Sequence, residues 1–145
     1  MSIADTTISP VAPAVPVINS APERATVLLA EDDRAMRRYL EVILQRAGYT
    51  VIAVADGLEA MKAALSSAVD LVVTDAIMPH LSGYELCRFL RRHPKLAHLP
   101  IVLMSGIDQA GPTCPAAPAD IRLTKPVRAE DLVKCLAGLS ASRQA

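Results

Sequence analysis

Short apolar runs alternate along this chain with longer segments that carry apolar residues at helical spacing. The runs lie at about residues 26–30, 50–54, 70–74, 101–104 and 121–124. The helical segments lie at about residues 33–47, 57–67, 82–93 and 128–139. Continuous apolar runs of this length are typical of strands buried on both faces, as in a parallel sheet covered by its crossover helices. The alternation therefore predicts an α/β fold built on a parallel sheet.

The spacing of apolar residues also predicts which side of each helix faces the sheet. The inward residues expected are Met36, Leu40, Ile43, Leu44 and Ala47 in 33–47, Leu58, Met61 and Leu65 in 57–67, and Leu132, Leu136 and Leu139 in 128–139. Ser82 is expected to cap 82–93, because Glu85 follows three residues later, as in a capping box. We expect Tyr39, Tyr49 and Tyr84 to be packing residues.

Proline and glycine mark the parts of the chain outside this pattern. Residues 1–24 contain four prolines among small and β-branched residues, which favours a disordered tail or linker. Between 106 and 120, three prolines and two glycines oppose a regular helix, so we expect an irregular connection. The predicted organisation is one domain over 25–140, long enough to bury a core, with a short tail at 141–145.

Composition excludes several classes of protein. The formal net charge is zero, which argues against a nucleic-acid partner. No apolar run approaches the roughly 18 residues of a membrane span, and the start of the chain lacks a basic segment. Cys87, Cys114 and Cys135 are widely spaced and fit neither a zinc site nor a disulfide framework. These features favour a cytoplasmic protein without membrane contact.

Charged residues follow several of the predicted strands. Glu31 and Asp32 come after 26–30, Asp75 comes after 70–74, and Lys125 comes after 121–124. Because the carboxyl ends of parallel strands share one edge of the sheet, where such folds bind ligands, these side chains should converge. Three acids and a lysine suggest a magnesium-dependent phosphate site. Taken alone, the early acids could instead cap the helix that follows, with Asp33 as the cap.

The same residues belong to motifs that occur in a familiar order. The motifs are Leu28-Leu29-Ala30-Glu31-Asp32-Asp33, Asp75-Ala76-Ile77-Met78-Pro79 followed by Gly83, Met104-Ser105-Gly106, and Lys125-Pro126. Over about residues 25–140 the chain resembles the receiver domain of two-component response regulators. The resemblance implies a flavodoxin-like (βα)5 doubly wound parallel sheet with strand order 2-1-3-4-5. The fourth helix of that fold would be irregular or missing here.

The resemblance also implies a role for each motif. Asp75 would be the phosphoacceptor, and Lys125 and Ser105 would contact the phosphoryl group. The implied ligands of Mg²⁺, or of Mn²⁺, are Glu31, Asp32, Asp75 and the backbone carbonyl of Ile77. The peptide bond between Lys125 and Pro126 is often cis in such domains. The module would catalyse its own phosphorylation and, because Ile77 cannot orient a water molecule, only slow dephosphorylation.

The implied partners are a histidine kinase or a histidine phosphotransfer protein, and a downstream protein reached through protein contacts. The chain ends soon after the last predicted helix, so we expect no DNA-binding domain, although the proline-rich start could be a linker of a hybrid kinase. Arg122 stands where this family usually has Tyr or Phe. That departure leaves open a degenerate receiver that binds partners without phosphorylation. A phosphohydrolase is disfavoured, because Ile77 replaces its second aspartate.

Overall fold

The computed structural model describes residues 25–106 and 119–144, with side chains described as far as residue 140. The described residues form five strands and four helices. The strands are β2 (Thr26–Ala30), β3 (Thr50–Val54), β4 (Leu71–Asp75), β5 (Ile101–Ser105) and β6 (Ile121–Thr124). The helices are α1 (Arg34–Arg46), α2 (Gly57–Ser66), α3 (Gly83–Arg92) and α4 (Ala129–Gln144). The expected tail at 1–24 and most of the expected irregular connection lie outside the described residues.

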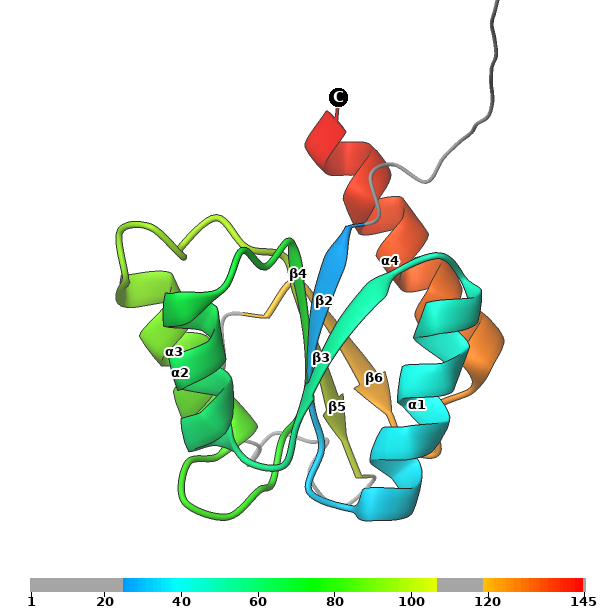
Figure 1. Cartoon of the computed structure of the whole chain (residues 1–145), viewed down its shortest axis with the longest axis horizontal. Helices are drawn as coiled ribbons and strands as arrows, with labels where there is room; N and C mark the ends of the chain where they lie inside the picture. Colours follow the sequence, from blue (N-terminus) through cyan, green and yellow to red (C-terminus); the bar gives the residue numbers. More distant parts are fainter. Residues whose placement is uncertain (1–24, 107–118, 145) are drawn as a thin grey trace, which may run out of the picture.

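The strands form one parallel sheet in the order β3-β2-β4-β5-β6. In chain order this is 2-1-3-4-5, so the predicted flavodoxin-like topology is confirmed. Figure 1 shows the strand arrows pointing the same way, towards the lower edge of the sheet in that view. The residues that follow β2, β4, β5 and β6 therefore meet at that edge.

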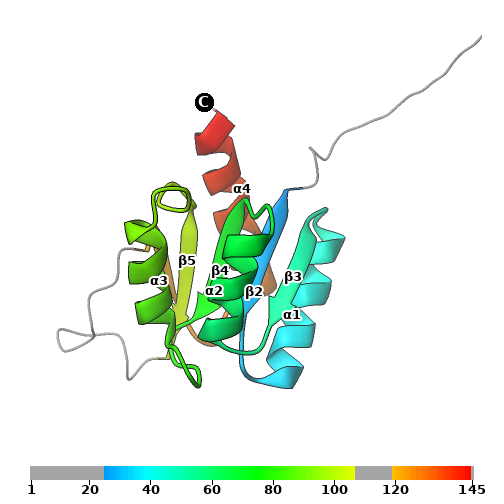
Figure 2. The ribbon, with the colours of Figure 1, turned by 60° about the vertical axis from the view of Figure 1, so that its left-hand side comes forward.

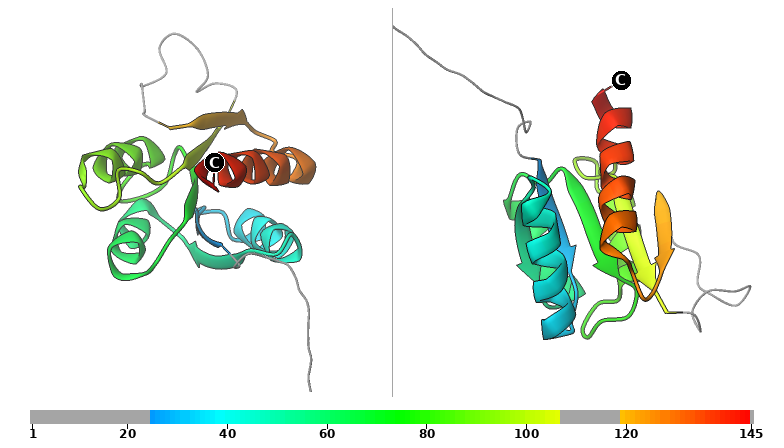
Figure 3. Two further views of the ribbon diagram at one scale, coloured as in Figure 1. Left: turned by 90° about the horizontal axis from the view of Figure 1, so that it is seen from above. Right: turned by 90° about the vertical axis from the view of Figure 1, so that its right-hand side faces the viewer.

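Helices cover both faces of the sheet. The view from above in Figure 3 shows α1 and α4 on one side and α2 and α3 on the other. The strands divide their side chains between the two layers: Val27 and Leu29 of β2 pack on the α1–α4 side, and Leu28 and Ala30 pack on the α2–α3 side. All four of these side chains are fully buried. The sheet thus lies between two apolar layers, one on each face.

Helix α2 buries a different face from the one that its leucines predict. Leu58 and Leu65 are 40% and 54% exposed, whereas Ala60 and Ala64 are buried. Helix α2 begins very close to the loop that connects β4 to α3. A Cβ atom on Gly57 would lie 2.0 Å from the Leu81 carbonyl oxygen of that loop. Gly57, Ala60 and Ala64 are thus the buried residues of α2, and Leu58 and Leu65 lie outside this face. Figure 2 shows α2 lying in front of the sheet, beside α3.

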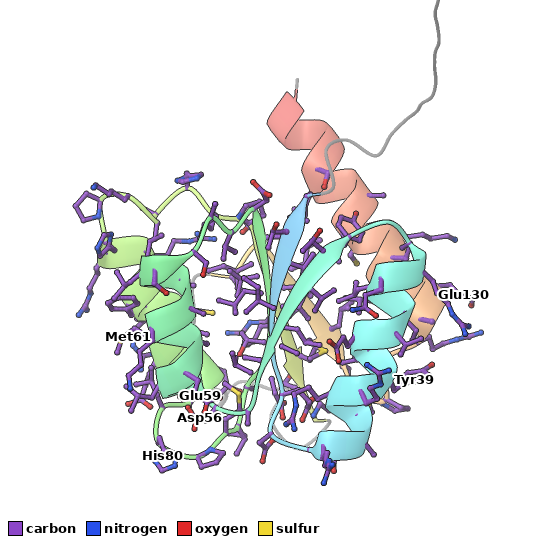
Figure 4. The ribbon with its side chains drawn as sticks, viewed as in Figure 1. Tyr39, Asp56, Glu59, Met61, His80 and Glu130 are labelled. Atoms are coloured by element: carbon purple, nitrogen blue, oxygen red, sulfur yellow. The ribbon has the colours of Figure 1, made fainter. Side chains whose placement is uncertain are left out.

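Other expectations about the helices have mixed outcomes. Ser82 caps α3 in a capping box with Glu85, as predicted. Tyr39 is 49% exposed on the outer side of α1 (Figure 4), so its prediction as a packing residue is wrong, while Tyr84 is buried. Helix α4 extends beyond the predicted end at 139 to Gln144, and the sequence from 140 to 144 holds no glycine or proline that would end it. No described helix is both long and apolar enough to span a membrane.

Candidate functional site

Three strand ends bring acidic and basic side chains together at the lower edge of the sheet. Lys125 follows β6, and its Nζ atom lies 3.0 Å from Oδ2 of Asp75, the last residue of β4. The same nitrogen lies 3.3 Å from Oε1 of Glu31, which follows β2. Lys125 is thus 94 residues from Glu31 in sequence and in contact with it. The sequence-based expectation of convergence at this edge agrees with the distances.

The acids form a compact group of oxygen ligands. One carboxylate oxygen each from Glu31, Asp32 and Asp75 lies within 4.8 Å of the other two. Glu31 and Asp75 are buried, and Asp32 is exposed, so the group is open on one side. Three carboxylates against one ammonium leave two formal negative charges in excess. Hard oxygen donors with uncompensated negative charge fit a divalent ion such as Mg²⁺, which keeps waters on its open side.

Burial perturbs the ionisation of this group. It raises the pKa of the Glu31 carboxyl from an ordinary 4.5 to about 7. The backbone N–H of Asp33 opposes the rise, the charge of Asp75 adds to it, and the Lys125 ammonium opposes it. Burial also lowers the pKa of Lys125, but hydrogen bonds and attraction from Asp75 and Glu31 outweigh this, and the net pKa is raised. Lys125 therefore stays charged beside the acids.

Backbone contacts hold the turn that carries Glu31 and Asp32. The N–H of Glu31 donates to the Val54 carbonyl of the neighbouring strand, at 3.1 Å. The N–H of Asp33 donates to Oε2 of Glu31, at 3.1 Å, while the Asp33 side chain caps α1. Arg37 reaches back from α1, and its Nη1 atom donates to the Glu31 carbonyl oxygen at 2.9 Å. Asp33 is the cap that the sequence suggests, whereas no sequence pattern indicates the contact made by Arg37.

Gly83 allows the start of α3 to lie very close to the backbone of Asp75. The N–H of Gly83 donates to the Ala76 carbonyl at 2.8 Å, and the N–H of Ala76 donates to the Met104 carbonyl at 2.8 Å. A Cβ atom on Gly83 would lie 2.0 Å from the Asp75 carbonyl oxygen, which no real side chain tolerates. The start of α3 thus packs directly on the end of β4. The sequence contained Gly83 in a motif, but no local pattern indicates this contact.

The loop after Asp75 also rests on α2. Gly57 lies against the Leu81 carbonyl, as described above, and Nε2 of His80 lies 3.9 Å from Oδ2 of Asp56, the cap of α2. Figure 4 shows His80 near Asp56 at this end of α2. His80 has a positive φ of 71°, an uncommon conformation outside glycine. The loop is therefore held on both sides, by α2 and by α3.

The remaining predicted residues lie around the same group. Ser105 is buried at the end of β5, and its carbonyl oxygen accepts the N–H of Lys125 at 2.7 Å. Ile77 is 51% exposed, two residues after Asp75. The peptide bond between Lys125 and Pro126 is cis, as expected. Arg122 is exposed on the edge strand β6. Ser105, Ile77 and the bond between Lys125 and Pro126 thus lie at the carboxyl end of the strands or just beyond it, whereas Arg122 lies within β6 opposite Leu103. The chemical roles of these residues stay predictions.

Comparison with known proteins gives this arrangement a context. A family model described as the response regulator receiver domain matches residues 27–137. The response regulator MprA of Mycobacterium ulcerans is 38% identical over 109 residues, which cover 74% of this chain and 46% of that protein. The transcriptional regulatory protein GltR of Pseudomonas aeruginosa is 35% identical over 80 residues, which cover 55% of this chain and 33% of that protein. The chain thus spans less than half the length of these two curated relatives.

Solved structures agree with the family match. The chemotaxis response regulator CheY4 of Vibrio cholerae has a TM-score of 0.71 at 31% identity, covering 78% of this chain and 96% of that one. The receiver domain of a sensor histidine kinase from Pseudomonas aeruginosa PAO1 has a TM-score of 0.71 at 29% identity, covering 77% and 93% of the two chains. That structure holds a magnesium ion coordinated in its active site cleft.

Proposed function

This chain belongs to the family of response regulator receiver domains, and from that premise we propose that it accepts a phosphoryl group on Asp75. The donor would be the phosphohistidine of a histidine kinase or of a histidine phosphotransfer protein. One observation carries the proposal: Lys125 Nζ lies 3.0 Å from the Asp75 carboxylate, inside a group of three acids that can share a divalent ion. The output would be a change in contacts with a downstream protein.

The proposed reaction is a transfer between two nucleophiles. An oxygen of the Asp75 carboxylate forms a bond to phosphorus, and the bond from phosphorus to the histidine nitrogen breaks. The electron pair of that bond stays on the imidazole nitrogen, which then takes a proton from solvent. The product is an acyl phosphate on Asp75. Because an anion approaches an anion, positive charge at the site must offset the repulsion.

Lys125 supplies part of that positive charge, and the acidic residues would hold a divalent ion that supplies the rest. The Lys125 ammonium, now bonded to Asp75, can move its hydrogen bond to a phosphoryl oxygen as the transfer proceeds. The hydroxyl of Ser105, at the end of the adjacent strand, can donate to another phosphoryl oxygen. Glu31, Asp32, Asp75 and the Ile77 carbonyl would hold Mg²⁺ or Mn²⁺. When bound, the ion supplies charge stabilisation to the phosphoryl oxygens.

The wider context of the domain is part of the proposal. Residues 25–140 would form the receiver unit, with 1–24 as a tail or linker and 141–145 at its end. The working environment would be cytoplasmic, and neither nucleic acid nor membrane would be a partner of this unit. Charge neutrality of the whole chain supports the first of these exclusions.

Incubation with a small-molecule phosphodonor and Mg²⁺ is expected to add one phosphoryl group to the wild-type chain, read by intact mass. Asp75→Asn removes the attacking oxygen and should show no gain, and omission of Mg²⁺ should reduce the gain strongly. Unmodified wild type under conditions where its fold is intact would contradict the proposal. It would instead favour the degenerate receiver that the exposed Arg122 on β6 leaves open.

We expect the phosphorylated chain to lose its phosphoryl group slowly. Ile77 is 51% exposed beside Asp75, and its side chain can neither donate nor accept a hydrogen bond to an attacking water. Ile77→Asn should therefore speed the decay several-fold, measured by the mass of the phosphorylated form against time. Ile77→Leu, which keeps an apolar side chain, is the control and should decay at the wild-type rate. Equal rates in all three would show that the side chain at this position does not limit hydrolysis.

A further inference from the structure

We propose that Arg37 is a positioning residue for the metal-binding acids, acting through the backbone of the turn that carries them. This inference rests on the proposed function in one respect, that Glu31 and Asp32 bind a divalent cation. The guanidinium of Arg37 does not need to touch the ion. It holds the peptide units between β2 and α1 in the orientation that directs the Glu31 and Asp32 side chains into the site.

The contact itself joins α1 to the turn. Nη1 of Arg37 donates to the Glu31 carbonyl oxygen at 2.9 Å and lies 3.5 Å from the Asp32 carbonyl oxygen, at the limit of a hydrogen bond. The first bond spans six residues and is partly buried. A charged donor makes such a bond stronger than one between neutral groups. One side chain thus restrains two successive carbonyl groups of the acidic turn.

The position of Arg37 on α1 makes this contact informative. Helix α1 starts at the same edge of the sheet as the site (Figure 1), and no acid lies in its first turn. Cations near a helix N-terminus are disfavoured by the helix dipole. The helix dipole therefore gives no reason for an arginine at this place. The bond to the Glu31 carbonyl gives one, and it serves the turn rather than the helix.

The acids differ in what else holds them. The Glu31 carboxylate is fixed by the N–H of Asp33 and by Lys125. Within the described part of the chain, no hydrogen bond holds the side chain of Asp32, which is exposed. Its direction is consequently set by the backbone at 31–33. Restraint of that backbone by Arg37 lowers the reorganisation needed when a cation arrives, as other groups behind metal ligands do.

Arg37 and its neighbour Arg38 form a matched pair for the test. Arg38 lies one residue on, is 69% exposed, and pairs with Glu41 at 3.3 Å rather than with the turn. Loss of either arginine removes the same formal charge from the same helix turn. Loss of a nearby positive charge should, by electrostatics alone, strengthen the binding of a cation. Positioning and simple charge thus predict opposite signs for Arg37→Ala.

The experiment is a Mg²⁺ titration of the ¹⁵N-labelled chain, followed by the amide shifts of Glu31 and Asp33. Arg37→Ala is expected to raise the Kd for Mg²⁺ by about tenfold, the lower end for groups behind metal ligands. Arg38→Ala should leave the Kd unchanged or slightly lower. Arg37→Lys keeps one donor for the Glu31 carbonyl and should fall between wild type and Arg37→Ala. Signals of the folded state alone are followed, so a loss of stability does not imitate a loss of affinity.

A second readout needs no metal. In Mg²⁺-free protein, hydrogen exchange of the Asp33 amide, which is bonded to Glu31, should be faster in Arg37→Ala and unchanged in Arg38→Ala. Equal Kd values for Arg37→Ala and Arg38→Ala would overturn the inference. A wild-type chain that binds no Mg²⁺ would instead reject the proposed function. In that case faster exchange at Asp33 would still support the positioning of the turn by Arg37, and unchanged exchange would reject it.

Discussion

Gly83→Ala is expected to lower the free energy of unfolding by about 3 kcal/mol, because the added methyl group has no space. Its Cβ atom would lie 2.0 Å from the Asp75 carbonyl oxygen and 2.9 Å from the Cα atom of Ala76. Both are backbone atoms at the end of the central strand β4, so no side-chain rotation relieves the overlap. Either α3 must move away from the sheet or the end of β4 must shift. Urea unfolding followed by circular dichroism measures the loss.

Gly138→Ala is the control for that substitution. Gly138 lies inside α4, where an added Cβ atom meets nothing within 4 Å. Alanine there should raise the free energy of unfolding by about 0.5–1 kcal/mol, because glycine is a poor helix former. The same chemical change thus has opposite signs at two glycines of one chain. A Gly83→Ala protein within 1 kcal/mol of wild type would show that α3 does not depend on this close approach.

The contrast between these glycines shows which parts of the fold the sequence could predict. The strands followed from apolar runs that are buried on both faces, such as the one in β4, whereas their order followed only from the resemblance to receiver domains. The inward face of α2 did not follow, because Leu58 and Leu65 have the spacing of a buried stripe and yet are exposed. That face depends on how close α2 lies to the Leu81 loop, which is a tertiary distance. Local periodicity carries no information on such distances.

The same limit applies to the site. The convergence of Asp75, Glu31 and Lys125 was predictable, because parallel strands end at one edge and charged residues follow three of them. The contact between Arg37 and the Glu31 carbonyl was not, because a basic residue on a helix is most often solvated. The one available signal was weak: an arginine in the first turn of a helix, where the dipole disfavours it. Contacts from side chain to backbone leave little trace in a single sequence.

Lys125→Met is expected to destabilise the Mg²⁺-free protein by about 2 kcal/mol at pH 8. Lys125 supplies the ammonium for two buried carboxylates, at 3.0 Å from Asp75 and 3.3 Å from Glu31. Methionine keeps most of the length of the side chain but leaves both acids without that charge. The cost is below the range for a fully buried pair, because the Lys125 side chain is 29% exposed. Added Mg²⁺ should restore more stability to the variant than to wild type.

The destabilisation caused by Lys125→Met depends on pH, because part of it comes from the ionisation of Glu31. The pKa of Glu31 is raised from 4.5 to about 7 in the folded protein, so the contribution of Glu31 to stability is largest below pH 4.5 and is lost as pH rises from there through 7. From about one pH unit above that pKa the wild-type contribution is level, because Glu31 is then ionised in both the folded and the unfolded state. Lys125 lowers this pKa, so its removal raises the pKa further, and the variant continues to lose stability above pH 7. The difference between the two proteins should therefore widen from pH 6 to pH 8.5.

Lys134→Met provides the matched control, because it removes the same charge from an exposed position on α4. Its free energy of unfolding should stay within about 0.5 kcal/mol of wild type at every pH. Unfolding curves at pH 6 and 8.5, each with and without Mg²⁺, give the free energy of unfolding of the wild type and of both variants. They show how the effect of removing Lys125 depends on pH and on the metal ion. If the difference between Lys125→Met and wild type stays constant from pH 6 to 8.5, the Lys125 ammonium does not stabilise the ionised form of Glu31. The 3.3 Å contact would then contribute no net stability, and the charge on Lys125 would act on Asp75 alone.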